Sequence, residues 1–286
     1  MPEYIDAYGV SIVYDVHRPA TAPRAIVQLL HGVGEHAGRY AAVIAELTAN
    51  GYIVYADDHR GHGRTGMRQH SDPADLGRLG RGGMPATVAA LRQFTTLIRS
   101  QNPDLPLVLL GHSWGSFLAQ MLVNDDPDAY DGVVLTGTAL RWPGSLNAGS
   151  LNAPWKGPDA TGREWLSSDP AVGEAFGADP LTTDRPLLTL FGPLDAARLF
   201  GRPGRGLRTR RGADLPILIM VGREDTVGGA TSAHRLARAY RERSGFDDIT
   251  TLIYPGARHE VFNEVRQDEV RADLIAWLDS RFPERS

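Results

Sequence analysis

Short runs of apolar residues alternate along this chain with stretches in which apolar residues recur every three or four positions. The short runs are rich in β-branched residues, which is typical of buried strands, and the periodic stretches are typical of amphipathic helices. The predicted strands are Val10–Val16, which alternates apolar and polar residues and is expected to be antiparallel, and Ala25–Leu30, Tyr52–Ala56, Leu105–Leu110, Gly132–Thr136, Pro216–Val221 and Ile249–Tyr254. The predicted helices are Tyr40–Ala49, Pro85–Ser100, Phe117–Val123, Thr231–Arg243 and Val261–Arg281. This order predicts an α/β fold with a mostly parallel sheet covered on both faces by helices.

The alternation stops between residues 141 and 213. This stretch has no β-like run and is rich in Gly, Pro, Leu and aromatic residues. Because it lies between two predicted core strands, we expect residues 1–140 and 214–286 to form the core and residues 141–213 to form an inserted helical cap, or lid. The inner face of the cap is expected to line a substrate pocket, and helices that only pack on the core are the alternative.

The end of this insertion is basic, since residues 198–211 contain six arginines and no acidic residue. Such a segment is compatible with contact to anionic lipid head groups at a membrane surface, and equally with a solvated loop.

The composition changes this picture little. The chain has 286 residues, 42% of them hydrophobic and 22% charged, and its net charge of −4 gives no indication of nucleic-acid binding. The absence of cysteine excludes disulfides, zinc–thiolate sites and a cysteine nucleophile.

No signal peptide is apparent in the sequence. The uncharged stretch Leu105–Asn124 is interrupted by Pro106 and by glycines, so a strand, a turn and a helix explain it better than a membrane span. We expect a cytoplasmic protein, with peripheral membrane contact as an open alternative.

One pentapeptide carries the clearest chemical signal. Gly111-His112-Ser113-Trp114-Gly115 is a Gly-x-Ser-x-Gly sequence that occurs once in the chain, between a predicted strand and a predicted helix. At a sharp strand-to-helix turn the serine hydroxyl projects above the end of the sheet, where it can attack a carbonyl. The pattern therefore predicts Ser113 as a nucleophile, and a serine that only caps the following helix is the alternative.

A serine nucleophile needs a base to take its proton and an acid to orient that base. Only His234 and His259 follow Ser113 in the chain. His259 comes after the last predicted strand and is the candidate base, whereas His234 lies within a helical pattern and is expected at the surface. Asp225 and Glu224 both follow the strand Pro216–Val221, and Asp225 is favoured as the acid because its side chain is shorter and stiffer.

Backbone N–H groups stabilise the negative charge that develops on a carbonyl oxygen under attack. Trp114, which follows the nucleophile, and Val33, in the glycine-rich loop after Ala25–Leu30, are the expected donors of this oxyanion hole. The turn Asp57–Arg64 contains two aspartates and two histidines, but no fourth ligand is spaced to complete a metal site. We interpret it as a structural turn and expect neither a metal nor a cofactor.

Five segments follow one another along the chain in a familiar order. They are HGVGEHAGRY (31–40), DHRGHGRTG (58–66), GHSWGS (111–116), GREDTV (222–227) and YPGARHEVFNE (254–264). Together they resemble the α/β-hydrolase family, and within it the monoacylglycerol lipase and lysophospholipase group. The resemblance implies that Ser113, Asp225 and His259 are nucleophile, acid and base, and that a mobile cap admits a single acyl chain. The chain departs from the family pattern at Trp114, where Met is usual, and at Ser116, which replaces a second glycine.

The expected function is that of a serine hydrolase that cleaves carboxylic esters of monoacyl lipids through an acyl-enzyme on Ser113. The alternatives are a same-fold esterase, lactonase or peptidase that acts on another small substrate, and a noncatalytic binding protein on this scaffold.

Overall fold

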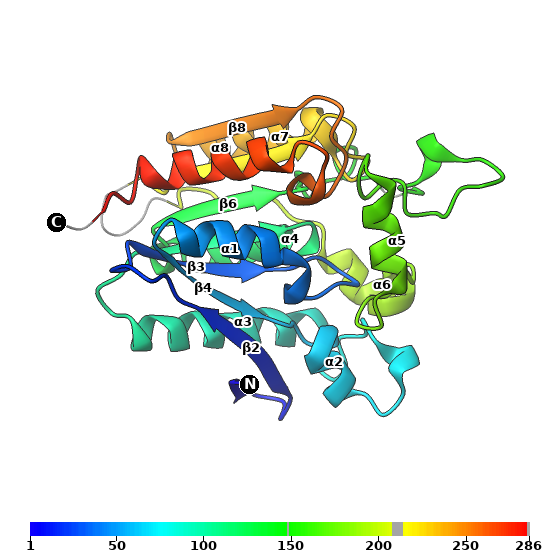
Figure 1. Ribbon diagram of the computed structural model, residues 1–286, viewed down its shortest axis with the longest axis horizontal. Helices are drawn as coiled ribbons and strands as arrows, with labels where there is room; N and C mark the ends of the chain where they lie inside the picture. Colours follow the sequence, from blue (N-terminus) through cyan, green and yellow to red (C-terminus); the bar gives the residue numbers. More distant parts are fainter. Residues whose placement is uncertain (148, 208–213, 285–286) are drawn as a thin grey trace.

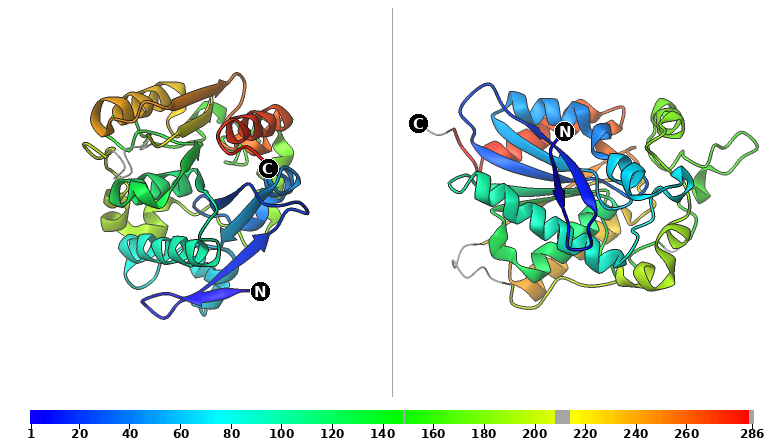
Figure 2. Two further views of the ribbon diagram at one scale, coloured as in Figure 1. Left: turned by 90° about the vertical axis from the view of Figure 1, so that its left-hand side faces the viewer. Right: turned by 90° about the horizontal axis from the view of Figure 1, so that it is seen from below.

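The computed structural model describes residues 1–147, 149–207 and 214–284. An eight-stranded sheet in the order β1-β2-β4-β3-β5-β6-β7-β8 forms its centre. β1 and β2 are antiparallel to their neighbours, and the remaining strands are parallel to one another. The strands are β1 (Glu3–Ile5), β2 (Ser11–His17), β3 (Ala25–Leu30), β4 (Tyr52–Asp57), β5 (Leu107–His112), β6 (Gly132–Thr136), β7 (Ile217–Gly222) and β8 (Ile249–Tyr254). Figure 2 shows how far the sheet twists between the N-terminal hairpin and β8.

Helices cover both faces of this sheet, as the sequence predicts (Figure 1). α1 (Ala41–Ala49) and α8 (Gln267–Asp279) pack on one face, and α3 (Gly83–Gln101), α4 (Trp114–Asp125) and α7 (Gly229–Ala239) pack on the other. Two hydrophobic clusters result, one on each side of strands that are buried along their whole length. The α/β fold predicted from the sequence is therefore confirmed.

One predicted element differs from the structure, and two observed elements were not predicted. The helix expected over Val261–Arg281 is wrong at its start, because Val261–Asn263 form one 3₁₀ turn and α8 begins only at Gln267. Strand β1 and helix α2 (Gly63–Gln69) were not predicted. The glycines of α2 argue against a helix, yet a Cβ on Gly66 would lie 2.3 Å from the carbonyl oxygen of Gly61, so only glycine fits there.

The chain leaves the sheet between β6 and β7, and its described residues there (141–147 and 149–207) are called the inserted segment. It contains α5 (Pro170–Ala178) and α6 (Leu187–Arg198), which lie at the carboxyl ends of the parallel strands (Figure 1). α6 is broken at Gly192, whose φ of 72° is left-handed, and Pro193 follows. In the described part of the chain, no helix has the length and apolar character needed to cross a bilayer.

Candidate active site

Ser113 lies on the sharp turn between β5 and α4. Its φ of 53° and ψ of −123° make it the one non-glycine residue with positive φ among those described. The flanking glycines allow this turn, because a Cβ on Gly115 would lie 2.2 Å from the carbonyl oxygen of Leu30. Strain of this kind persists only when the surrounding structure enforces it, and here it aims the Ser113 side chain away from the sheet into a cavity.

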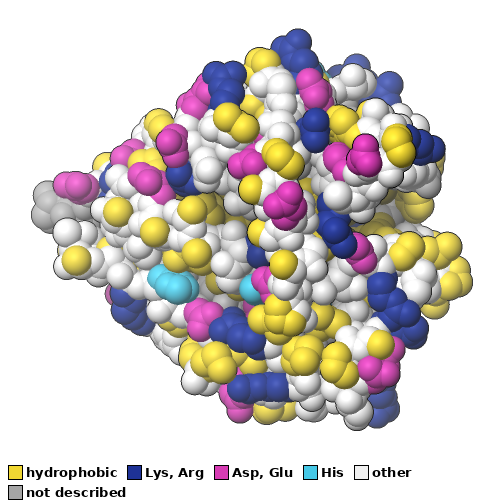
Figure 3. Space-filling model, turned by 45° about the vertical axis from the view of Figure 1, so that its right-hand side comes forward, with side chains coloured by type: hydrophobic (Ala, Val, Ile, Leu, Met, Phe, Trp, Pro, Cys, Tyr) yellow, Lys and Arg dark blue, Asp and Glu magenta, His cyan; other side chains and the backbone are white. Residues whose placement is uncertain are grey.

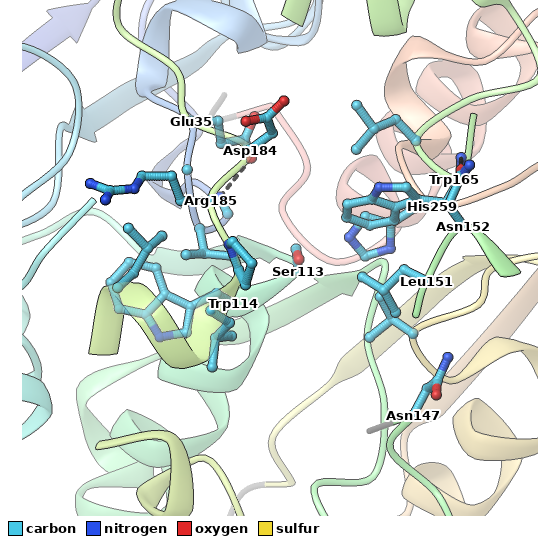
Figure 4. Close-up of a pocket in the computed structure, with 18 of the residues that line it drawn as sticks. Glu35, Ser113, Trp114, Asn147, Leu151, Asn152, Trp165, Asp184, Arg185 and His259 are labelled. Carbon is cyan, nitrogen blue, oxygen red and sulfur yellow. Dashed lines mark hydrogen bonds between the residues drawn. The ribbon is translucent and has the colours of Figure 1, made fainter. Parts of the chain in front are cut away.

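His259 and Asp225 come from the loops after β8 and β7. Nδ1 of His259 lies 3.0 Å from Oδ1 of Asp225, and both side chains are buried. The same carboxylate oxygen accepts the backbone N–H of Val227 at 2.8 Å, which fixes its orientation. Nε2 of His259 is buried without a hydrogen-bond partner among the described residues, and Figure 4 shows the imidazole beside Ser113.

The environment of His259 favours its protonated form. Burial alone would lower the pKa of the imidazole, but the charge and the hydrogen bond of Asp225 outweigh burial, so the pKa lies above its ordinary value. An imidazole in this setting is basic enough to take a proton from a hydroxyl beside it.

The loop after β3 presents a second set of backbone groups to the same cavity. The N–H of Gly32 donates to Oε1 of Glu35 at 2.6 Å, and this bond holds the loop in place. Among the described residues, no acceptor is bonded to the N–H of Val33 or of Trp114, and both residues line the cavity with Ser113. A Cβ on Gly34 would lie 2.2 Å from the carbonyl oxygen of Thr183, so the inserted segment approaches this loop closely.

Arg39 joins the two loops that flank the cavity. Its guanidinium lies 3.0 Å from Glu35 and 2.6 Å from Glu260, the residue after His259, and all three side chains are nearly inaccessible to solvent. Burial opposes ionisation of Glu35, but Arg39 and neighbouring hydrogen-bond donors outweigh it, and the pKa of this carboxyl is lowered. Burial dominates at Glu260, whose pKa is raised.

Three other histidines near the site, His31, His62 and His112, are buried and have lowered pKa values, which favours their neutral form. Burial lowers the pKa of His112 to about 3 and that of His62 to about 4. His31 holds its loop, since Nδ1 lies 2.7 Å from the carbonyl oxygen of Gly32 and Nε2 accepts the backbone N–H of His59 at 2.9 Å. The charged side chains of the turn Asp57–Arg64 mostly pair with protein groups, for example Asp57 with His59 and Asp58 with Arg64. No group of three metal-ligating side chains occurs in the part of the chain that the structure describes.

A cavity of about 670 Å³ opens above Ser113, which is within the range of small-ligand sites. The inserted segment forms one wall and the loops of the sheet form the other. Its apolar lining includes Val33, Trp114, Phe117, Leu146, Leu151, Trp165, Phe176, Leu187, Leu190 and Leu199. The indole of Trp114 packs against Phe191 at 5.0 Å between ring centroids, so this residue contributes to the apolar wall in addition to its backbone N–H.

The structure separates the competing candidates. Glu224 and His234 are exposed at the surface, whereas Asp225 and His259 are buried together. The sequence analysis assigned no role to Arg39, Glu260 or Trp165, because the contacts of Arg39 with Glu260 and of Trp165 with His259 join residues far apart in the chain. Arg39 and Glu260 do lie in two of the five motif segments, but the segments alone do not show that these residues pair.

The basic end of the insertion is only partly described, and residues 208–211 lie outside the described residues. Within it, Arg198 pairs with Asp195, and the guanidinium of Arg202 stacks 3.4 Å above the ring of Trp142.

Comparisons with known proteins identify relatives that match this chain over most of its length. A family model described as serine aminopeptidase, S33, matches residues 21–266. The chain is 34% identical to a monoacylglycerol lipase of Mycolicibacterium smegmatis, over 95% of this chain and 94% of that one. It is 27% identical to the monoglyceride lipase of Mus musculus, over 98% and 91% of the two chains. A thermostable carboxyl esterase from Bacillus coagulans, solved in complex with glycerol, is 25% identical and superposes with a TM-score of 0.84 over 98% of both chains.

Proposed function

The chain belongs to the serine aminopeptidase S33 family of α/β-hydrolases, and we propose that its substrates within this family are monoacylglycerols, whose ester bond it hydrolyses. The observation that carries the proposal is the buried His259–Asp225 pair beside Ser113, at the floor of an apolar cavity. The monoacylglycerol lipase named above, with 34% identity over nearly the full length of both chains, supports the lipid substrate.

We assign the roles in this reaction as follows. Oγ of Ser113 attacks the ester carbonyl carbon while its proton passes to Nε2 of His259, and Asp225 stabilises the imidazolium that forms. The backbone N–H groups of Val33 and Trp114 stabilise the carbonyl oxygen as it becomes negative. His259 returns the proton to the departing glycerol oxygen. Water then attacks the carbonyl carbon of the acyl-enzyme while one of its protons passes to His259, and His259 protonates Oγ of Ser113 as the fatty acid leaves.

Peptide hydrolysis, which the name of the family suggests, has less support in the cavity. An aminopeptidase needs a free carboxylate to bind the ammonium group of its substrate. Three carboxylates line this cavity, and each already pairs with an arginine: Glu35 and Glu260 with Arg39, and Asp184 with Arg163. The remaining lining of the cavity is mostly apolar, which favours the binding of an acyl chain.

We also propose that residues 141–213 act as a cap through which lipid enters from a membrane surface. Leu188, Leu194 and Phe200 are between 43% and 65% exposed, and two of them, Leu188 and Phe200, also line the cavity. Figure 3 shows hydrophobic side chains gathered on the side of the molecule that carries this segment, with basic side chains beside them. Cosedimentation with phospholipid vesicles tests this idea, and a Leu188→Ser, Leu194→Ser protein that binds vesicles as well as the parent would contradict it.

Labelling by a fluorophosphonate probe tests the catalytic assignment. We expect the probe to label Ser113 in the parent protein and to leave Ser113→Ala unlabelled. A panel of monoacylglycerols, lysophospholipids, p-nitrophenyl esters and aminoacyl p-nitroanilides then tests the substrate class. Preference for p-nitrophenyl acetate or for the anilides over monoacylglycerols would overturn the lipid assignment while leaving the serine hydrolase in place.

A further inference from the structure

Trp165, from the inserted segment, lies directly against His259. The centroids of the indole and the imidazole are 4.8 Å apart, and the two ring planes are inclined by 40° (Figure 4). The two rings are therefore in tilted contact, within the distance of about 6 Å at which a cation is attracted to an aromatic ring.

Backbone hydrogen bonds hold Trp165 in this place. Its carbonyl oxygen accepts the N–H of His259 at 3.4 Å, and the next carbonyl, that of Leu166, accepts the N–H of Glu260 at 2.7 Å. The N–H of Trp165 donates to Oδ1 of Asn152 at 3.0 Å. Trp165 is thus tied to the loop that carries His259 as well as to its own segment.

Side chains reinforce this tie. Nη1 of Arg258 donates to the carbonyl oxygens of Glu164 and Ser167, at 2.6 and 2.9 Å. The carboxylate of Glu264 accepts the backbone N–H groups of both Arg258 and Ser168. Five successive residues, 164–168, are therefore anchored to the loop of residues 258–264, and these bonds hold the indole of Trp165 against the imidazole of His259.

We propose that Trp165 is a positioning residue for ester hydrolysis, and that its indole face stabilises the His259 imidazolium that forms when Ser113 attacks. The proposal rests on the function proposed above, in which His259 is the base. The imidazolium is buried, and a cation–π contact strengthens when the cation is removed from water. The contribution appears only in the charged state, so it lowers the barrier to attack rather than the energy of the resting enzyme.

Several other ionisable groups face His259 from the elements around it. Asp225 binds Nδ1 from the loop after β7, and His112, at the end of β5, lies 4.8 Å away between ring centroids. Glu35 and Glu260 act from farther away and share Arg39. Because Trp165 carries no charge, its replacement leaves all of these groups in place.

The pH dependence of kcat/KM tests the proposal. Trp165→Leu removes the π-surface, so we expect the acid limb of the profile to move to lower pH by roughly 0.5–1 unit. Trp165→Phe retains a smaller aromatic face, so its acid limb should shift less than that of Trp165→Leu. If the leucine variant does not fold, the comparison of Trp165→Phe with the parent protein tests the proposal. Trp142→Leu is a matched control, because this tryptophan lies outside the cavity and should leave the acid limb unmoved.

The rate of fluorophosphonate labelling, measured over the same pH range, separates the possible failures. If Ser113 of the parent is not labelled, the proposed function itself is wrong. If the parent is labelled and the acid limb of Trp165→Leu coincides with that of the parent or moves to higher pH, only the role of Trp165 is wrong. Equal shifts in the leucine and phenylalanine variants would assign the effect to lost packing and would also overturn the proposal.

Discussion

Gly137 offers a direct test of how tightly the base is positioned. It follows β6 with a φ of 52°, and it lies between two imidazole rings. A Cβ at this position would be 2.7 Å from Cε1 of His112 and 2.9 Å from Cε1 of His259. Because carbon atoms in contact are normally about 3.5–4.0 Å apart, Gly137→Ala must move His259 by roughly 0.6–1 Å.

A displacement of this size is expected to lower both the rate of catalysis and the stability of the fold. Misplacement of a reacting group by about 1 Å can lower the rate on the order of 100-fold, and we expect such a loss in kcat. The left-handed backbone costs about 1–2 kcal/mol for a residue with a Cβ, and overpacking adds about 1–3 kcal/mol. A domain with a typical unfolding free energy of about 5–15 kcal/mol is expected to stay folded.

The assay compares Gly137→Ala with Gly144→Ala in ester hydrolysis, fluorophosphonate labelling and urea unfolding. Gly144 also has a left-handed φ, 76°, but no atom lies within 4 Å of a Cβ built there. The control therefore carries the backbone strain without the contact to His259. If folded Gly137→Ala turns over as fast as Gly144→Ala, the reasoning is refuted.

Three further predictions follow from the site. Asp225→Asn is expected to lower kcat about 10⁴-fold because the amide favours the wrong tautomer of the base, whereas Glu224→Gln, at an exposed neighbour, should match the parent in the same assay. The raised pKa of His259 predicts that kcat/KM falls as pH is lowered through a midpoint above the ordinary histidine value near 6.5, and a pH profile with its midpoint below 6 contradicts this. Arg39→Met leaves two buried carboxylates unpaired and should lower the unfolding free energy at pH 7 by about 3–5 kcal/mol in urea titration, against at most about 1 kcal/mol for Arg68→Met at an exposed ion pair.

Much of the core could be predicted from the sequence because burial on both faces leaves a clear apolar run, as in β3 and β6, whose bounds agree with the predicted strands residue for residue. The bounds of β8 also agree, although this edge strand is mostly half-buried, because its residues are largely β-branched or aromatic. The prediction failed where apolar residues are buried for another reason. Val261 and Phe262 suggest a continuing helix, but they are buried in a loop whose backbone is bonded to the inserted segment at Leu166.

Residue type and chain order were sufficient to select Ser113, Asp225 and His259 as candidates, because in this fold each of the three roles is filled from a particular loop. A motif fixes the nucleophile locally, and the carboxyl ends of β7 and β8 are the positions from which side chains reach it. The positions of residues in the inserted segment are not fixed by the topology of the sheet in this way, so their contacts could not be predicted. The position of Trp165 over His259 follows from hydrogen bonds between residues about 94 positions apart, and nothing near either residue in the sequence specifies that pairing.

The pairing of Arg39 with two carboxylates shows why such contacts matter to the chemistry. Glu35 and Glu260 come from the loops after β3 and β8, and a free negative charge on either would further favour a protonated His259. A base that is protonated at working pH cannot accept the proton of Ser113. By sharing one guanidinium, the two carboxylates bring the loops after β3 and β8 together and have part of their charge compensated. The raised pKa of His259 thus depends mainly on Asp225, whose hydrogen bond also fixes the tautomer that leaves Nε2 free to face the serine.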